Sequence, residues 1–96
     1  MLDNVFSWLD KNTSIFDTYG VSIVERFRTP DNVSEPAMYV DVENEVNYAR
    51  ITIWENGNCD IYIYEIESME MISSMHLELV DDIGIVSAFN LMLAKM

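Results

Sequence analysis

The side chains that could act as a nucleophile or as an acid–base catalyst are few in this chain. His76 is the only histidine, and it lies in a run of Ser, Met, Leu and Glu residues. A lone histidine in a strand of that composition is more often half-buried and structural than catalytic. Cys59, the only cysteine, lies in an alternating apolar run with no Lys, Arg or His close in sequence to lower its pKa. We therefore expect Cys59 to pack as a small hydrophobe, and we expect no catalytic site.

Carboxylates are plentiful, but their spacing does not specify a metal or cofactor site. The adjacent Asp81 and Asp82 stand where a helix is expected to begin, and there they suit capping and the helix dipole. The segment from Glu55 to Asp60 meets only part of the pattern of a calcium loop, and we interpret it as a turn. The sequence contains neither a Gly-rich phosphate loop nor a Gly-x-Ser-x-Gly motif. No cofactor or metal is expected.

The charge balance indicates a binding protein. The chain has 17 Asp and Glu against 5 Lys and Arg, a formal net charge of −12 on 96 residues. Such a surface repels nucleic acid and anionic membranes, whereas it attracts basic protein surfaces and speeds encounter with them. Because half of the residues are hydrophobic, the chain should still fold, as a single domain over residues 1–96. It has no apolar run of membrane-spanning length, and Met1 to Asn4 do not begin a signal peptide, so a cytoplasmic location is expected.

Helical periodicity occurs at the two ends of the chain. The first helix is predicted from Leu2 to about Tyr19, with Asp3 and Asn4 at its start and Gly20 at its end. A break is expected at 12–14, where Asn, Thr and Ser are poor helix formers. The second helix is predicted from Asp81 to Met96.

Between the helices the period changes to two, which predicts strands. In the first strand, Val21, Ile23 and Phe27 should share the buried face, with Arg26 and Arg28 on the other, although Val24 and Glu25 blur the alternation. A Pro-containing loop follows, and further strands are expected at 38–43, 48–54, 59–64 and 71–79. The order predicts an α+β domain: an antiparallel meander of four or five strands with both helices packed on one face.

The length of the turn between the third and fourth strands decides which residues of the two strands lie opposite each other. A two-residue turn at 56–57 would place apolar residues opposite polar ones. A three-residue loop at 56–58 instead places Ile53 opposite Ile61 and Ile51 opposite Ile63, which keeps one face apolar. The buried face therefore favours the longer loop.

The opposite face of this sheet is the candidate binding surface. Aromatic rings alternate there with charged groups, a composition typical of interaction hot spots. An alternative is that the aromatic residues only stabilise the strands, with Arg50 forming a cation–π contact with Tyr64 across the pair. The predicted partner-binding residues are Tyr39, Asp41, Glu43, Tyr48, Arg50, Trp54, Asp60, Tyr62 and Tyr64.

The second half of the chain resembles a known family. The run Trp54-Glu55-Asn56-Gly57-Asn58-Cys59-Asp60, followed by a β-run, Leu77-Glu78-Leu79 and a closing amphipathic helix, is similar to small immunity proteins of bacterial polymorphic-toxin systems of the TriTu type. The resemblance covers about Arg50 to Met96. It implies a cytoplasmic antidote that binds a cognate toxin domain and blocks its active site or substrate groove.

The acidity would suit a basic toxin such as a nuclease, bound by a chain that is monomeric on its own, with the 29–37 loop at the rim of the contact. Two alternatives stay open. One is a nucleic-acid mimic, which needs carboxylates spaced along one elongated face. The other is a structural or adaptor domain that self-associates through the aromatic face.

Overall fold

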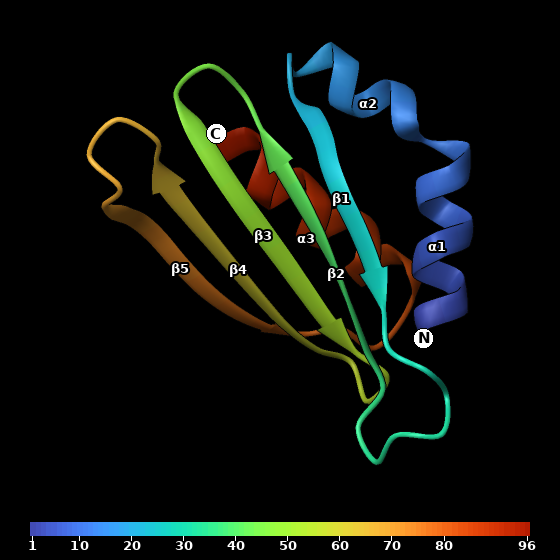
Figure 1. Cartoon of the computed structure of the whole chain (residues 1–96). Coiled ribbons are helices and arrows are strands. Elements are labelled where there is room, and N and C mark those ends of the chain that lie inside the picture. Colours follow the sequence, from blue (N-terminus) through green and yellow to red (C-terminus); the bar gives the residue numbers. More distant parts are fainter.

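The computed structural model describes all 96 residues, and it places an antiparallel sheet against helices from both ends of the chain (Figure 1). The elements are α1 (Leu2–Lys11), α2 (Thr13–Thr18), β1 (Ser22–Arg28), β2 (Ala37–Glu43), β3 (Asn47–Trp54), β4 (Asn58–Glu65), β5 (Met71–Glu78) and α3 (Asp82–Lys95). The strands lie in the order β1-β2-β3-β4-β5, so each pairs with its sequence neighbour. The predicted α+β meander with five strands is confirmed.

The apolar face of the sheet is sealed by α1 and α3. In β2, β3 and β4 every second side chain is fully buried, as in Val40, Ile51 and Ile61. These side chains join those of Leu2, Val5 and Leu9 from α1 and five residues of α3 in one core of 20 residues. Figure 1 shows α3 behind the middle of the sheet and α1 beside β1, which leaves the near face of the sheet uncovered. None of the three helices combines the length and the hydrophobicity that a membrane-spanning segment needs.

The N-terminal helix does break at Asn12, as the poor helix formers there predict. Asn12 leaves the helical conformation, with φ −128° and ψ 22°, and its side-chain amide donates to the Trp8 carbonyl at 2.8 Å. Gly20 follows α2 with φ +68°, the left-handed conformation expected of it.

The start of α1 differs from the prediction that Asp3 and Asn4 cap it. Neither Asp3 nor Asn4 caps the helix, because Met1 is the residue before its first turn. Glu55, from the turn between β3 and β4, accepts hydrogen bonds from the Met1 ammonium at 2.7 Å and from the Leu2 N–H at 3.1 Å. Asp3 pairs with Arg28 instead.

A β-bulge in β1 reverses the predicted faces in the second half of that strand, whereas Val21 is buried and Ile23 packs against the core as predicted. Ile23 pairs with Val42 and Glu25 with Asp41, so Val24 is an extra residue between them. After the bulge, Phe27 lies on the uncovered face, whereas Arg26 and Arg28 turn toward the helices. Their guanidinium carbons lie 5.1 and 5.7 Å from the Phe6 ring centroid, and they pair with acidic residues of α1.

The register between β3 and β4 also differs from the prediction, by two residues. Ile51 pairs with Ile61 and Ile53 with Cys59, because the three-residue loop is 55–57 and not 56–58. A shift of two residues keeps every side chain on its face, so the predicted division into buried and open faces is confirmed. The loop is placed by Gly57, whose φ of +93° suits glycine and whose carbonyl accepts from the Leu79 N–H at 2.7 Å.

The end of the chain follows its prediction. Asp81 caps α3 by accepting from the Gly84 N–H at 2.9 Å, and Asp82 lies in the first turn. A second bulge lies at the start of β5, where Ser73 pairs with Ile63 but Met71 pairs with Tyr64.

Candidate functional site

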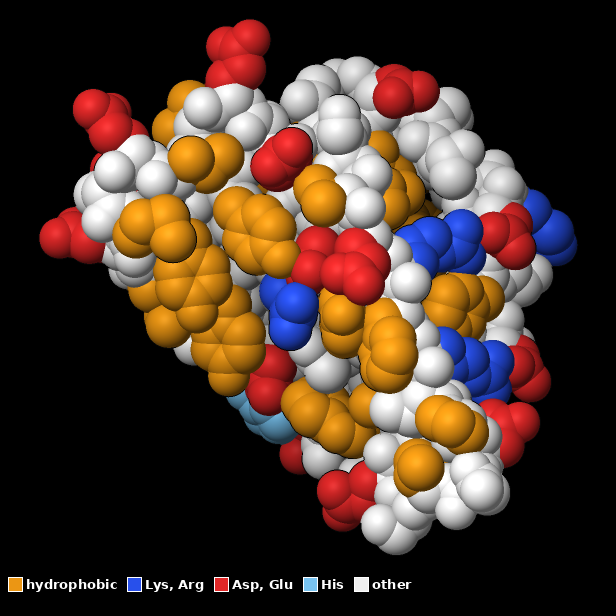
Figure 2. Space-filling model, viewed as in Figure 1, with side chains coloured by type: hydrophobic (Ala, Val, Ile, Leu, Met, Phe, Trp, Pro, Cys, Tyr) orange, Lys and Arg blue, Asp and Glu red, His pale blue; other side chains and the backbone are white.

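The uncovered side of the sheet, called the open face below, carries all the side chains predicted to bind a partner. They alternate with the buried residues along β2, β3 and β4, and the cross-strand pairs keep them together: Asp41 faces Arg50, and Arg50 faces Tyr62. Figure 2 views this face and shows hydrophobic side chains over much of it, with acidic side chains mostly around its margin. The full predicted set, all on this face, is Tyr39, Asp41, Glu43, Tyr48, Arg50, Trp54, Asp60, Tyr62 and Tyr64.

An ion pair lies at the centre of the open face. Arg50 donates from Nε and Nη2 to the two carboxylate oxygens of Asp41, at 2.7 and 2.9 Å. The guanidinium carbon lies 3.9 Å from the centroid of the Tyr39 ring, which in turn stacks on Phe27 at 5.2 Å. The expected contact between Arg50 and Tyr64 is therefore wrong, because the register places Tyr62 opposite Arg50 and the arginine lies on Tyr39.

Burial and hydrogen bonding set the protonation of this centre. Asp41 is only 3% exposed. Burial by itself would raise the pKa of Asp41, but the paired Arg50 guanidinium, aided by the nearby Tyr48 hydroxyl, outweighs it and holds the pKa below its ordinary value. Burial and the Asp41 carboxylate raise the pKa of Tyr48 to about 12. At neutral pH the carboxylate is thus charged, and both of its oxygens already accept hydrogen bonds from Arg50.

A second polar pair lies toward the β5 side of the open face. His76 Nδ1 lies 2.6 Å from Asp60 Oδ1, across the β4–β5 pair. The His76 side chain is 57% exposed, so the expectation of a half-buried structural histidine is wrong. Trp54 and Asn56 border the same shallow hollow. These groups can donate and accept hydrogen bonds at the surface of a partner.

An apolar groove opens at the other end of the face, where the β2–β3 and β4–β5 turns meet. The Ile66 N–H donates to the Val46 carbonyl at 2.9 Å and joins the two turns. The groove has a volume of about 430 Å³, and its walls are Tyr48, Tyr64, Ile66 and Met69, with Glu43 and Glu65 completing the lining.

The sequence did not indicate several residues of this face. The alternation predicts Phe27 on the buried side, and only its irregularity at Val24 and Glu25 indicates the bulge that turns Phe27 outward. Ile66 and Met69 lie in a turn, where no periodicity shows which way a side chain points.

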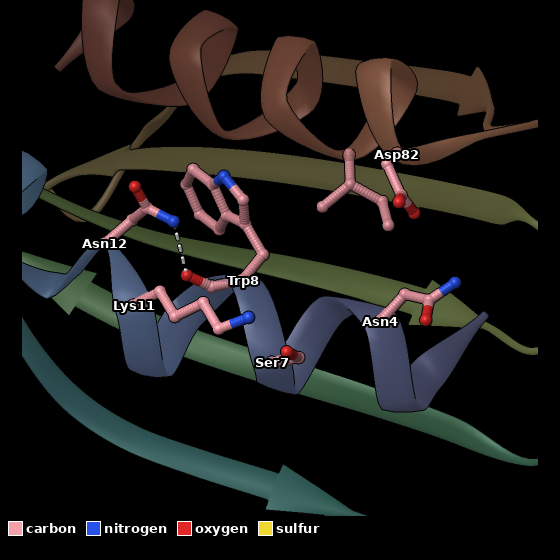
Figure 3. Close-up of a pocket in the computed structure, with 7 residues that line it drawn as sticks. Asn4, Ser7, Trp8, Lys11, Asn12 and Asp82 are labelled. Atoms are coloured by element: carbon pink, nitrogen blue, oxygen red, sulfur yellow. Dashed lines mark hydrogen bonds between the residues drawn. The ribbon is translucent and has the colours of Figure 1, made fainter.

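The remaining hollows and reactive side chains do not indicate a second binding site. The one between α1 and the start of α3 has a volume of about 200 Å³, and Figure 3 shows its polar lining from both helices, with Trp8 reaching between them. The Trp8 ring stacks on Phe89 at 4.9 Å, so it belongs to the packing of α1 on α3. No group of three or more His, Cys, Asp or Glu side chains is placed to hold a metal ion. Cys59 is fully buried, as expected, and burial raises its pKa to about 12.

One protein family matches almost the whole chain. The family described as Immunity protein TriTu matches residues 3–95. The chain belongs to the TriTu immunity protein family. The match confirms the resemblance seen in the second half and extends it through α1, β1 and the Pro-containing loop, which the sequence alone did not relate to any family. No curated protein sequence matches this TriTu protein significantly.

Proposed function

We propose that this TriTu immunity protein neutralises a basic toxin domain by binding it with the open face. The observation that carries the proposal is the contrast between the two sides of the sheet. One side is sealed by α1 and α3, whereas the other leaves aromatic rings uncovered around a central ion pair. Exposed apolar patches of this kind, edged by polar groups, mark interaction surfaces.

The aromatic side chains would supply most of the affinity. Tyr39, Tyr48, Trp54, Tyr62 and Tyr64 are all half-buried in the free chain, so strand pairing already restricts them. Ordering them further on binding costs little entropy, and each still has area to desolvate. We assign these five residues the role of anchors.

Charge would supply steering and the choice of partner. With a net charge of −12, the chain attracts cationic surfaces at long range. A nuclease needs a basic groove to hold its anionic substrate, so a nuclease toxin fits this surface, and occupying the groove would block the activity. Since Asp41 is held by Arg50, we assign steering to exposed Glu43 and to the acidic turns, and we assign Asp41 the positioning of Arg50.

The direct test compares two tyrosines. Tyr62→Ala removes a ring from the middle of the open face, whereas Tyr19→Ala removes one that is 46% exposed at the end of α2. Binding is measured by surface plasmon resonance against the cognate toxin domain. Tyr62→Ala should weaken binding roughly 30-fold or more, chiefly through faster dissociation, as expected for a hot-spot aromatic residue.

Tyr19→Ala is the matched control and should bind within about twofold of the parent chain, as expected for a residue outside the interface. Thermal unfolding of both variants checks that they remain folded. An unchanged affinity for folded Tyr62→Ala, or a loss for Tyr19→Ala instead, would place the contact elsewhere on the molecule.

A further inference from the structure

Exposed apolar side chains are concentrated at the end of the open face where the β2–β3 and β4–β5 turns meet. Five of the large hydrophobic side chains that are exposed in the structure come from the two joined turns and the start of β5: Val46, Ile66, Met69, Met71 and Ile72. Two of them, Ile66 and Met69, form walls of the groove together with Tyr48 and Tyr64. This concentration in one small region is typical of a surface that is covered in a complex.

Met69 gives this end of the face a second unusual feature. Its φ is +59°, which makes it the one residue other than glycine with positive φ, and it is 76% exposed. Glycine or asparagine suits that conformation better than methionine does. An exposed thioether contributes little to the core, so the fold itself does not explain a methionine here. Its flexible, polarizable side chain does suit the wall of a groove that closes on a ligand.

The charge around the groove is of one sign. Glu43 and Glu65 are part of its lining, and Glu45, Glu67 and Glu70 are exposed in the same two turns. No lysine or arginine lines the groove; Arg50, the cation of the open face, is held by Asp41. An apolar groove with carboxylates at its edge is complementary to a side chain that has an aliphatic stem and a cationic end.

We propose that this groove receives one arginine or lysine side chain of the toxin, with the stem between the Tyr48 and Tyr64 rings and the cationic group near Glu43 and Glu65. The inference rests on the proposed function for the identity of the partner. The chemistry of the groove, however, can be tested without a toxin.

The probe is N-acetyl-arginine-N-methylamide, and the readout is the NMR signal of Met69 in a chain labelled with ¹³C at the methionine methyl groups. The Met69 signal should shift saturably, with a Kd on the order of millimolar for a single side chain. The signals of the buried Met38 and Met92 serve as internal references and should not move. The citrulline analogue has the same shape without the charge and should bind roughly threefold more weakly or worse, the range expected of partly exposed charge pairs.

A matched pair of variants locates the charge effect. Glu65→Gln removes a carboxylate at the groove, whereas Glu78→Gln removes one at the far end of β5, opposite Asn58. Glu65→Gln should weaken arginine binding roughly two- to fivefold, and Glu78→Gln should leave it unchanged. An unmoved Met69 signal, equal binding of the citrulline analogue, or equal effects of the two variants would overturn the inference. Such a result would leave toxin binding by the rest of the open face untouched, and a failed toxin titration would not alter this one.

Discussion

The buried carboxylate of Asp41 shows how single residues organise the open face. A charge that is 3% exposed is costly unless it is paired, and here the bidentate Arg50 guanidinium satisfies both carboxylate oxygens. The pair fixes Arg50 on the Tyr39 ring, which stacks on Phe27. One ion pair thus orders aromatic side chains from β1 and β2 before any partner arrives.

A double-mutant cycle on this pair should show strong coupling. Arg50→Met leaves the Asp41 carboxylate buried without its main partner and should cost roughly 1–3 kcal/mol of the free energy of unfolding. Asp41→Asn should cost about 1–2 kcal/mol, and the double variant should cost less than the sum by about 1 kcal/mol or more. Urea unfolding at pH 7 measures all four chains. Strict additivity would show that the pair does not interact energetically.

The pH dependence of the same cycle has a defined sign. Because the folded-state pKa of Asp41 lies below its ordinary value of 3.8, the unfolded chain takes up the proton first as the pH falls. The stabilisation by Asp41 is therefore complete above that value and is lost as the pH falls through the folded pKa. The stability difference between the parent chain and Asp41→Asn should narrow below about pH 4.

At the scale of elements, close backbone contacts account for what the sequence could and could not predict. The alternation in β2, β3 and β4 assigned each side chain to the correct face of the sheet, because one apolar face had to be covered, but it did not show that Asp41 is buried within the open face. It could not place the β3–β4 loop, which depends on Gly57 meeting the Leu79 backbone 22 positions later. It also could not identify Glu55 as the acceptor at the start of α1, because the two segments are far apart in sequence. The bulge at Val24 left a visible irregularity, but its effect on Phe27 depends on pairing with β2.

Two glycine substitutions separate conformational from steric requirements. A Cβ at Gly57 would lie 2.2 Å from the Leu79 carbonyl oxygen, whereas a Cβ at Gly20 meets nothing within 4 Å, and both residues have positive φ. Gly20→Ala should lower Tm by about 4–8 °C for the conformation alone. Gly57→Ala should lower Tm at least about twice as much, because it also displaces the contact with Leu79. Calorimetry that found equal losses would contradict this account of the loop.

At the scale of the whole molecule, the fold divides stability and recognition between the two sides of one sheet. The sealed side holds a core of 20 residues, and the open side presents rings, an internal ion pair and an acidic margin. The net charge of −12 disfavours the pairing of two copies and favours a cationic partner, so we expect a monomer until the toxin binds. On the open face the acidic groups lie mostly around the margin rather than in one elongated row, which argues against a nucleic-acid mimic that uses this face.

Hydroxyl-radical footprinting of the free and toxin-bound chain tests most directly whether the open face is the binding surface. Mass spectrometry reports the oxidation of each aromatic side chain, and the exposed Tyr19 serves as the reference outside the face. We predict that Tyr39, Trp54, Tyr62 and Tyr64 become protected in the complex while Tyr19 is oxidised as before. Protection of Tyr19 or of the exposed Ile83 and Leu91 on α3, with the open-face residues unchanged, would contradict the account.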